Sequence, residues 1–139
     1  MTFAYQIETD VDKVNFQEVA EVLHSAVLAK ETDIPNTEKA FRNSDLTIFV
    51  KDGDRVIGVG RALTDFVSQS AIYNVAVDSA YQGQHVGHNI ITLLLEKLKG
   101  TNIILYTHPQ TLTLYEKYGF RRNKTDFSHF SHGDRKSVV

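Results

Sequence analysis

Residues 75–91 form the pattern in this sequence with the clearest chemical meaning. An apolar run of the β-strand type ends at Asp78, a polar stretch with Gly83 and Gly87 follows, and an amphipathic helical pattern then begins. A helix that starts just beyond a strand presents unpaired backbone N–H groups and the positive end of its dipole. Glycine lets this backbone approach a ligand closely because no Cβ lies in the way. The pattern therefore predicts a site for a phosphate group.

The spacing of apolar residues predicts the elements that must position this site. The expected strands are residues 3–7, 46–51, 55–64, 69–78 and 102–107, with a last strand or two from Phe120 onward, and the expected helices are residues 15–28, 37–43, 86–99 and 111–118. Their order predicts a meander of antiparallel strands that leads into one right-handed β-α-β crossover. We therefore expect one α/β (α+β) domain over residues 1–139, with a mixed, mostly antiparallel sheet of six to seven strands and helices on both faces.

The composition narrows the class of protein. A net charge of −2 argues against a nucleic-acid partner, and no apolar run approaches the roughly 18–20 residues that cross a membrane. The chain has no cysteine, which excludes disulfides, thiolate zinc sites and a cysteine nucleophile. The N-terminal residues lack the charged and apolar regions of a signal peptide, so a cytoplasmic location is expected.

Two segments together resemble the GCN5-related N-acetyltransferase family. The family's phosphate turn reads Arg/Gln-x-x-Gly-x-Gly/Ala, and residues 84–89 here read Gln-His-Val-Gly-His-Asn, so that Asn89 departs from the usual small residue. The family's second segment reads Leu-Tyr-x-Lys-x-Gly-Phe, and residues 114–120 read Leu-Tyr-Glu-Lys-Tyr-Gly-Phe. The resemblance covers about residues 72–120 and implies the acyl-CoA N-acyltransferase fold.

The resemblance also implies an acetyl-CoA cosubstrate and a set of residues that bind it. These residues are Val75, Ala76, Val77, Gln82, Gly83, Gln84, His85, Val86, Gly87, His88, Asn89, His108 and Tyr115. In the family the N–H at the Val75 position points at the acetyl oxygen, and Val77 pairs with the pantetheine amides. Tyr115 takes the place of the general acid, and a phenol, with an ordinary pKa near 10, suits protonation of an alkyl thiolate. Without cysteine, direct attack of an amine in a ternary complex is the simpler route.

The sequence gives weaker evidence for the residues that bind the amine acceptor. Arg61, Asp65, Tyr73 and Asn74 are candidate residues for binding the amine, although a charged turn between strands explains the Arg61–Asp65 stretch equally well. The general base is unassigned, because this chain has no carboxylate just before Val75, where other family members place one.

His108 stands where the family often has an asparagine that contacts pantetheine. It could make the same contact, relay a proton or cap a strand end.

Other interpretations stay open at this point. The pairs His85 with His88 and His129 with His132 have the i, i+3 spacing of helical metal ligands, but neither has an evident third ligand, so no metal is expected. The chain could be a non-catalytic acetyl-CoA sensor, or could use a longer acyl-CoA. The acceptor could be a small-molecule amine or a protein amine, and the sequence does not decide between a monomer and a homodimer.

Overall fold

The computed structural model describes residues 3–26, 33–106 and 112–122 of the 139-residue chain. The chain divides into two compact units, Met1–Ile104 and Leu105–Val139. The first unit contains the sheet, apart from the last residue of its fifth strand, together with three α-helices. The second contains the short helix α4 (Leu112–Glu116). One domain over residues 1–139 stays a prediction.

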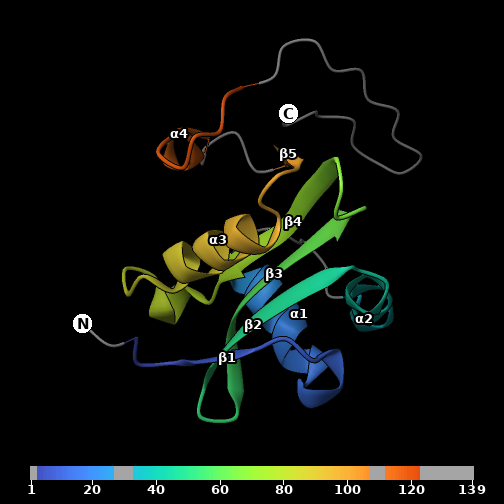
Figure 1. The fold of residues 1–139 in the computed structure, drawn as a ribbon. Coiled ribbons are helices and arrows are strands. Elements are labelled where there is room, and N and C mark those ends of the chain that lie inside the picture. Colours follow the sequence, from blue (N-terminus) through green and yellow to red (C-terminus); the bar gives the residue numbers. More distant parts are fainter. Residues whose placement is uncertain (1–2, 27–32, 107–111, 123–139) are drawn as a thin grey trace. The chain divides into compact units, whose positions relative to one another are not determined.

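A five-stranded sheet forms the centre of the first unit (Figure 1). Its strands, in spatial order, are β1 (Gln6–Glu8), β2 (Leu46–Asp52), β3 (Arg55–Thr64), β4 (Gln69–Val77) and β5 (Asn102–Leu105). The first four pair antiparallel as a meander. The Asn102 N–H donates to the Ser68 carbonyl (2.8 Å), so β5 begins beside the start of β4. The chain therefore crosses back from the end of β4 to form the predicted β-α-β unit, and the mixed sheet is confirmed.

The strand count differs from the predicted six to seven. The described residues contain five strands, and residues 120–122, where a further strand was expected to start, form none. Residues 123–139 lie outside the described part of the chain.

Helices cover both faces of the sheet, as predicted (Figure 1). Helix α1 (Phe16–Ser25) lies on one face, and α2 (Ile34–Arg42) packs beside it. The core on this face consists of buried side chains from both helices and three strands: Phe16, Val19, Val22, Leu23, Phe41, Phe49, Val56, Val59 and Ala76. Full burial of one such side chain stabilises the fold by about 1.5–3 kcal/mol. This face of the sheet therefore anchors α1 and α2 mainly by apolar burial.

Helix α3 (Val86–Lys97) covers the opposite face and rests directly on the backbone of β3. A Cβ added at Gly58 would lie 2.8 Å from Val86 Cγ1, and one added at Gly60 would lie 2.7 Å from Ile90 Cγ2. A Cβ at either position would force the side chains of α3 to shift, so the two glycines allow the close approach of helix and strand. The first turn of α3 is thereby fixed close to the end of β4.

The helix starts follow local chemistry. The side chain of Asn15 accepts the Gln17 N–H at the start of α1, and that of Asp33 accepts the Asn36 N–H in α2. Helix α2 begins earlier than the predicted residue 37, because Pro35 in the first turn has no N–H to leave unpaired. In the part of the chain that the structure describes, no helix has the length and apolar character needed to cross a membrane.

Candidate active site

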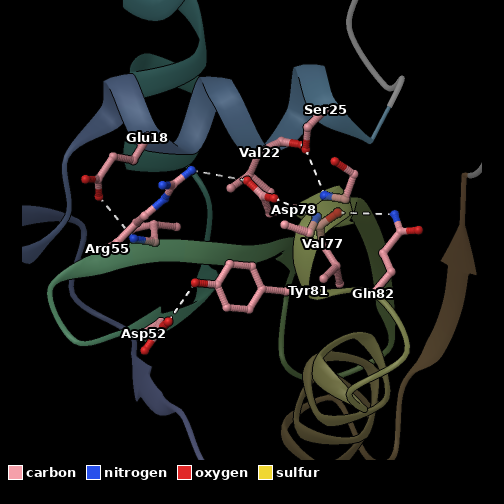
Figure 2. A network of polar contacts seen from close by, with 12 residues as sticks. Glu18, Val22, Ser25, Asp52, Arg55, Val77, Asp78, Tyr81 and Gln82 are labelled. Atoms are coloured by element: carbon pink, nitrogen blue, oxygen red, sulfur yellow. Dashed lines mark hydrogen bonds and ion pairs between the residues drawn. The ribbon is translucent and has the colours of Figure 1, made fainter.

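Asp78 organises the exit of β4, where the phosphate turn was predicted (Figure 2). Its N–H donates to the Ile57 carbonyl (2.8 Å), and its Oδ1 accepts the Ala80 N–H (2.9 Å) at the start of the 3₁₀ turn η2 (Ser79–Tyr81). Its Oδ2 lies 3.5 Å from Arg55 Nη2. The side chain is buried, and these contacts satisfy it while fixing the direction in which the chain leaves the sheet.

Two tyrosines support the turn from the side. The Tyr81 hydroxyl donates to Asp52 Oδ2 (2.6 Å), and this carboxylate raises the pKa of the Tyr81 phenol (Figure 2). The ring of Tyr5 packs edge-on against Tyr81, with ring centres 5.7 Å apart. The Tyr5 hydroxyl also donates to Gln84 Oε1, inside the turn. The predicted cosubstrate turn is therefore attached to the β2–β3 hairpin and to the segment before β1.

The turn itself is exposed, and its backbone leads into a helix without a side-chain cap. Residues 82–85 are exposed, Gly83 has φ +84°, and His85 has φ +66° at the N-cap of α3. His85 makes no side-chain cap, and the first helical bond runs from the Asn89 N–H to the His85 carbonyl (3.0 Å). The N–H groups of the intervening first turn, including Gly87, have no helical acceptor. This arrangement suits an anion at the positive end of the helix.

The structure shows what Gly87 and Asn89 contact within the phosphate-turn motif. A Cβ added at Gly87 would lie 3.5 Å from Val77 Cγ2, an ordinary contact, so the fold itself does not require glycine there. The side chain of Asn89, which departs from the family pattern, donates from Nδ2 to the His85 carbonyl (2.8 Å). Gln82 Nε2 donates to the Val77 carbonyl at 3.4 Å. Neither amide side chain takes the place of a helix cap.

The metal interpretation gains no support in the described ranges. His85 and His88 have ring centres 6.4 Å apart and nearly perpendicular planes. Residues 3–26, 33–106 and 112–122 contain no group of three or more potential ligands of the His, Cys, Asp or Glu type. The pair His129 and His132 lies outside the described residues.

A β-bulge interrupts β4 in the segment predicted to face the acetyl group. It is defined by the pairs on either side, Val59 with Ala76 and Arg61 with Tyr73. Between these pairs β3 contributes only Gly60, whereas β4 contributes Asn74 and Val75. Asn74 has φ +56°, in the left-handed region. A bulge leaves the extra residue outside the regular ladder and re-aims the local backbone. The bulge was not predicted from the sequence. Its one local signal is an asparagine inside a strand, since asparagine tolerates this conformation.

Three of the four predicted acceptor residues lie together at this bulge. Arg61 Nε donates to Asn74 Oδ1 (2.7 Å), and the Arg61 guanidinium lies over the Tyr73 ring, 5.0 Å from its centre. Burial lowers the pKa of the Arg61 guanidinium. Their role in binding an amine stays a prediction.

Asp65 lies in the turn between β3 and β4. Its carboxylate accepts the hydroxyl of Ser68 (2.6 Å) and the backbone N–H groups of Val67, Ser68 and Gln69. These bonds, with that from the Ser68 hydroxyl foremost, hold the pKa of Asp65 well below its ordinary value. The carboxylate therefore closes its own turn, and binding of an acceptor ammonium stays a prediction.

The chain also matches a known family over most of this region. The model of the family described as "Acetyltransferase (GNAT) domain" matches residues 43–122, which is more than half of the chain. The chain belongs to the GNAT family. The match includes the bulge, the phosphate turn and the Tyr115 segment, so the resemblance stated from the sequence is confirmed.

Individual GNAT relatives agree with this assignment. The chain is 32% identical over 94 residues to a ycf52-like N-acetyltransferase of Prochlorococcus marinus, covering 63% of this chain and 52% of that protein. It is 32% identical over 101 residues to the chloroplastic GCN5-related N-acetyltransferase 1 of Arabidopsis thaliana, covering 69% and 51%. The chain thus spans about half the length of these two relatives. A GNAT-family acetyltransferase structure from Streptococcus pneumoniae shares the fold, with a TM-score of 0.74 at 23% identity, over 95% of this chain and 99% of that one.

The segment predicted to supply the general acid belongs to the second unit. Tyr115 lies on α4 and is buried, with 8% of its surface exposed. Its ring contacts those of Tyr118 and Phe120, at centre distances of 6.5 and 6.3 Å. Gly119, with φ +92°, follows the helix. The acid role of Tyr115 stays a prediction, and the interpretations of His108 fall on a residue outside the described part of the chain.

Proposed function

We propose that this protein transfers an acetyl group from acetyl-CoA to a primary amine by direct attack in a ternary complex. The observation that carries the proposal is the exposed, uncapped start of α3 at the end of β4. The backbone N–H groups of this first turn, which have no acceptor within the helix, suit the pyrophosphate of a CoA thioester. GNAT membership adds the expectation that the acyl end of this ligand lies along the second half of β4, where the bulge occurs.

The reaction then divides among a few groups. The amine nitrogen attacks the thioester carbonyl carbon, and negative charge develops on the carbonyl oxygen, where the Val75 N–H acts as donor. The carbon–sulfur bond breaks, the amine nitrogen loses a proton to a base that we leave unassigned, and the leaving thiolate takes a proton from Tyr115. No acyl-enzyme step is invoked, since the chain contains no cysteine.

The test is the substitution Tyr115→Phe, which keeps the ring and removes the acidic proton. General acid catalysis typically contributes about 10²–10⁴-fold, so kcat should fall by that order while acetyl-CoA affinity changes little. Tyr118→Phe, which removes a hydroxyl three residues away, serves as the matched control and should keep kcat. The loss in Tyr115→Phe should shrink with a donor whose leaving thiol is more acidic. Wild-type kcat in Tyr115→Phe would remove Tyr115 from the mechanism.

The same assay separates the alternatives. A wild-type protein that binds CoA tightly but turns over none of a panel of small amines and lysine peptides would be a sensor rather than an enzyme. A preference for longer acyl chains, measured with one amine, would identify a different acyl-CoA as the donor.

A further inference from the structure

The bulge in β4 contains Asn74, whose left-handed backbone conformation must be stabilised by contacts with neighbouring residues. Asn74 has φ +56°, which asparagine tolerates better than most residues but only glycine adopts freely. Such conformations persist where the surrounding contacts hold them, and they cluster at functional sites. Asn74 directly precedes Val75, so the contact that fixes Asn74 also sets the direction of the Val75 N–H.

Arg61 supplies that contact from the neighbouring strand. Its Nε donates to Asn74 Oδ1 at 2.7 Å. Because the donor is charged, this hydrogen bond is stronger than one between neutral groups. Arg61 is paired directly with Tyr73, the residue before Asn74, so the bond reaches one step along β4 to the bulged residue.

The guanidinium of Arg61 is itself held in place. It lies over the rings of Tyr73 (5.0 Å) and Phe41 (5.8 Å), and its Nη1 donates to Ser44 Oγ (3.2 Å) just beyond the end of α2. None of the ion pairs found within residues 3–26, 33–106 and 112–122 joins it to a carboxylate. The half-buried guanidinium is therefore oriented by two rings and a hydroxyl, and its charge is directed at the amide oxygen of Asn74.

We propose that Arg61 is a positioning residue for acyl transfer: it holds Asn74 in the left-handed conformation and thereby aims the Val75 N–H at the acyl oxygen of the bound thioester. The proposal rests on the acetyltransferase function proposed above. It assigns Arg61 a role different from the direct amine binding expected from the sequence. An oxyanion donor acts in the transition state, so a misaimed Val75 N–H lowers kcat and leaves the KM for the amine nearly unchanged.

The decisive experiment is a double-mutant cycle of Arg61→Met and Asn74→Gly. Methionine keeps an unbranched apolar chain against the two rings but cannot donate to Asn74. Glycine adopts φ +56° without support, so it removes the need for Arg61. Loss of one oxyanion donor lowers kcat about 10²–10³-fold, so Arg61→Met, which only misaims it, should lower kcat about tenfold or more. Asn74→Gly should stay near the wild type, and the double variant should regain most of the loss, which is non-additive behaviour.

Arg42→Met provides the matched control. The Arg42 guanidinium also lies over an aromatic ring, that of Phe16 at 5.6 Å, and it pairs with Asp12 and Glu38. These partners lie on α1, on α2 and just before α1, not on β4. Its kcat should equal that of the wild type. Three outcomes overturn the proposal: a raised amine KM at unchanged kcat in Arg61→Met, equal loss of kcat in Arg61→Met and the double variant, or a lower melting temperature with wild-type kcat at 25 °C.

A second measurement does not depend on turnover. The backbone amide resonance of Val75 should shift more on binding acetyl-CoA than on binding CoA, because only the former carries the carbonyl. Arg61→Met should abolish this difference and the double variant should restore it. If the wild type turns over no amine, the acetyltransferase proposal fails, while the resonance still decides whether Arg61 aims the donor. A difference that is equal in wild type and Arg61→Met would overturn the role of Arg61.

Discussion

The turns at the two ends of β4 differ in whether a side chain accepts their backbone N–H groups. Before the strand, the Asp65 carboxylate accepts three consecutive N–H groups, those of residues 67–69. After it, His85 begins α3 without any side-chain cap, in an exposed turn. Backbone donors bonded to a side chain close a turn, whereas the first-turn donors of a helix, which have no acceptor within the helix, suit an anionic ligand. The same strand therefore joins a turn that Asp65 closes to an exposed turn that we propose binds the cosubstrate.

The largest effect, on the CoA-dependent stabilisation, is expected from placing a carboxylate at the start of α3. Gly87→Glu places a carboxylate among the donors at the start of α3, and the backbone there accommodates a Cβ, which would lie 3.5 Å from Val77 Cγ2. In the wild type, CoA at a hundredfold excess over Kd should add about 2.7 kcal/mol to the free energy of unfolding. Gly87→Glu should lose this gain while folding normally, as measured by melting with and without CoA.

Gln17→Glu is the control for charge, because it adds a carboxylate to the exposed first turn of α1. It should keep the full CoA-dependent shift. A full shift in Gly87→Glu as well would show that the phosphate site lies elsewhere.

A smaller effect, on the melting temperature, is expected from weakening the hydrogen bonds that Asp65 accepts in the β3–β4 turn. Asp65→Asn weakens the acceptor of the β3–β4 turn, so it should lower the melting temperature at pH 7 and leave the CoA-dependent shift unchanged. The folded protein holds the pKa of Asp65 below its ordinary value, so the stabilisation is present above the unfolded pKa of about 3.9 and is lost as the pH falls below it. The difference in melting temperature between wild type and Asp65→Asn should therefore narrow below about pH 4.

Asp54→Asn removes another exposed carboxylate, from the β2–β3 turn, and should show a smaller difference. Kinetics separate the structural role of Asp65 from the acceptor role: a higher KM for the amine, at unchanged KM for acetyl-CoA, would show that Asp65 also binds the ammonium group.

The smallest effect, on the free energy of unfolding, is expected at His85, which links the exposed turn to α3. His85 has φ +66°, so His85→Gly relieves the left-handed strain but makes the unfolded chain more flexible. These terms nearly cancel, and stability should change by only about 0.5 kcal/mol. The CoA-dependent shift should persist if backbone N–H groups bind the phosphate. Its loss in His85→Gly, measured in the same melting experiment, would instead assign the binding to the imidazole.

Local patterns in the sequence were sufficient to predict most of the fold. Residues 55–64 were predicted as a strand and form β3, because apolar periodicity and a turn at each end depend only on neighbours along the chain. The mixed sheet followed from the order of such elements. The start of α2 was predicted at residue 37 instead of Ile34, because proline, which is common in loops, also suits the first turn of a helix.

The candidate site was only partly predictable. The exposed turn could be predicted, since its glycines and the following helix are contiguous. The bulge could not, because it depends on which residues of β3 and β4 face each other, and Arg61 and Asn74 are thirteen positions apart. The functions of Gly58 and Gly60 also depend on contacts with Val86 and Ile90, nearly thirty residues later. Pairing across strands and layers, rather than local propensity, determined what was missed.

Gly58 and Gly60 also fix the distance between the two ends of the proposed acetyl-CoA site. Gly58 lies under Val86, next to the open turn, whereas Gly60 lies under Ile90 and opposite the bulge. Because α3 contacts β3 at two glycines, which have no side chains, the separation between the proposed anion-binding end and the bulge depends on the backbone. A donor whose arm is shorter or longer than that separation cannot reach both ends at once. The proposed site would therefore select donors by length, because the two glycines of β3 fix the distance between its two ends.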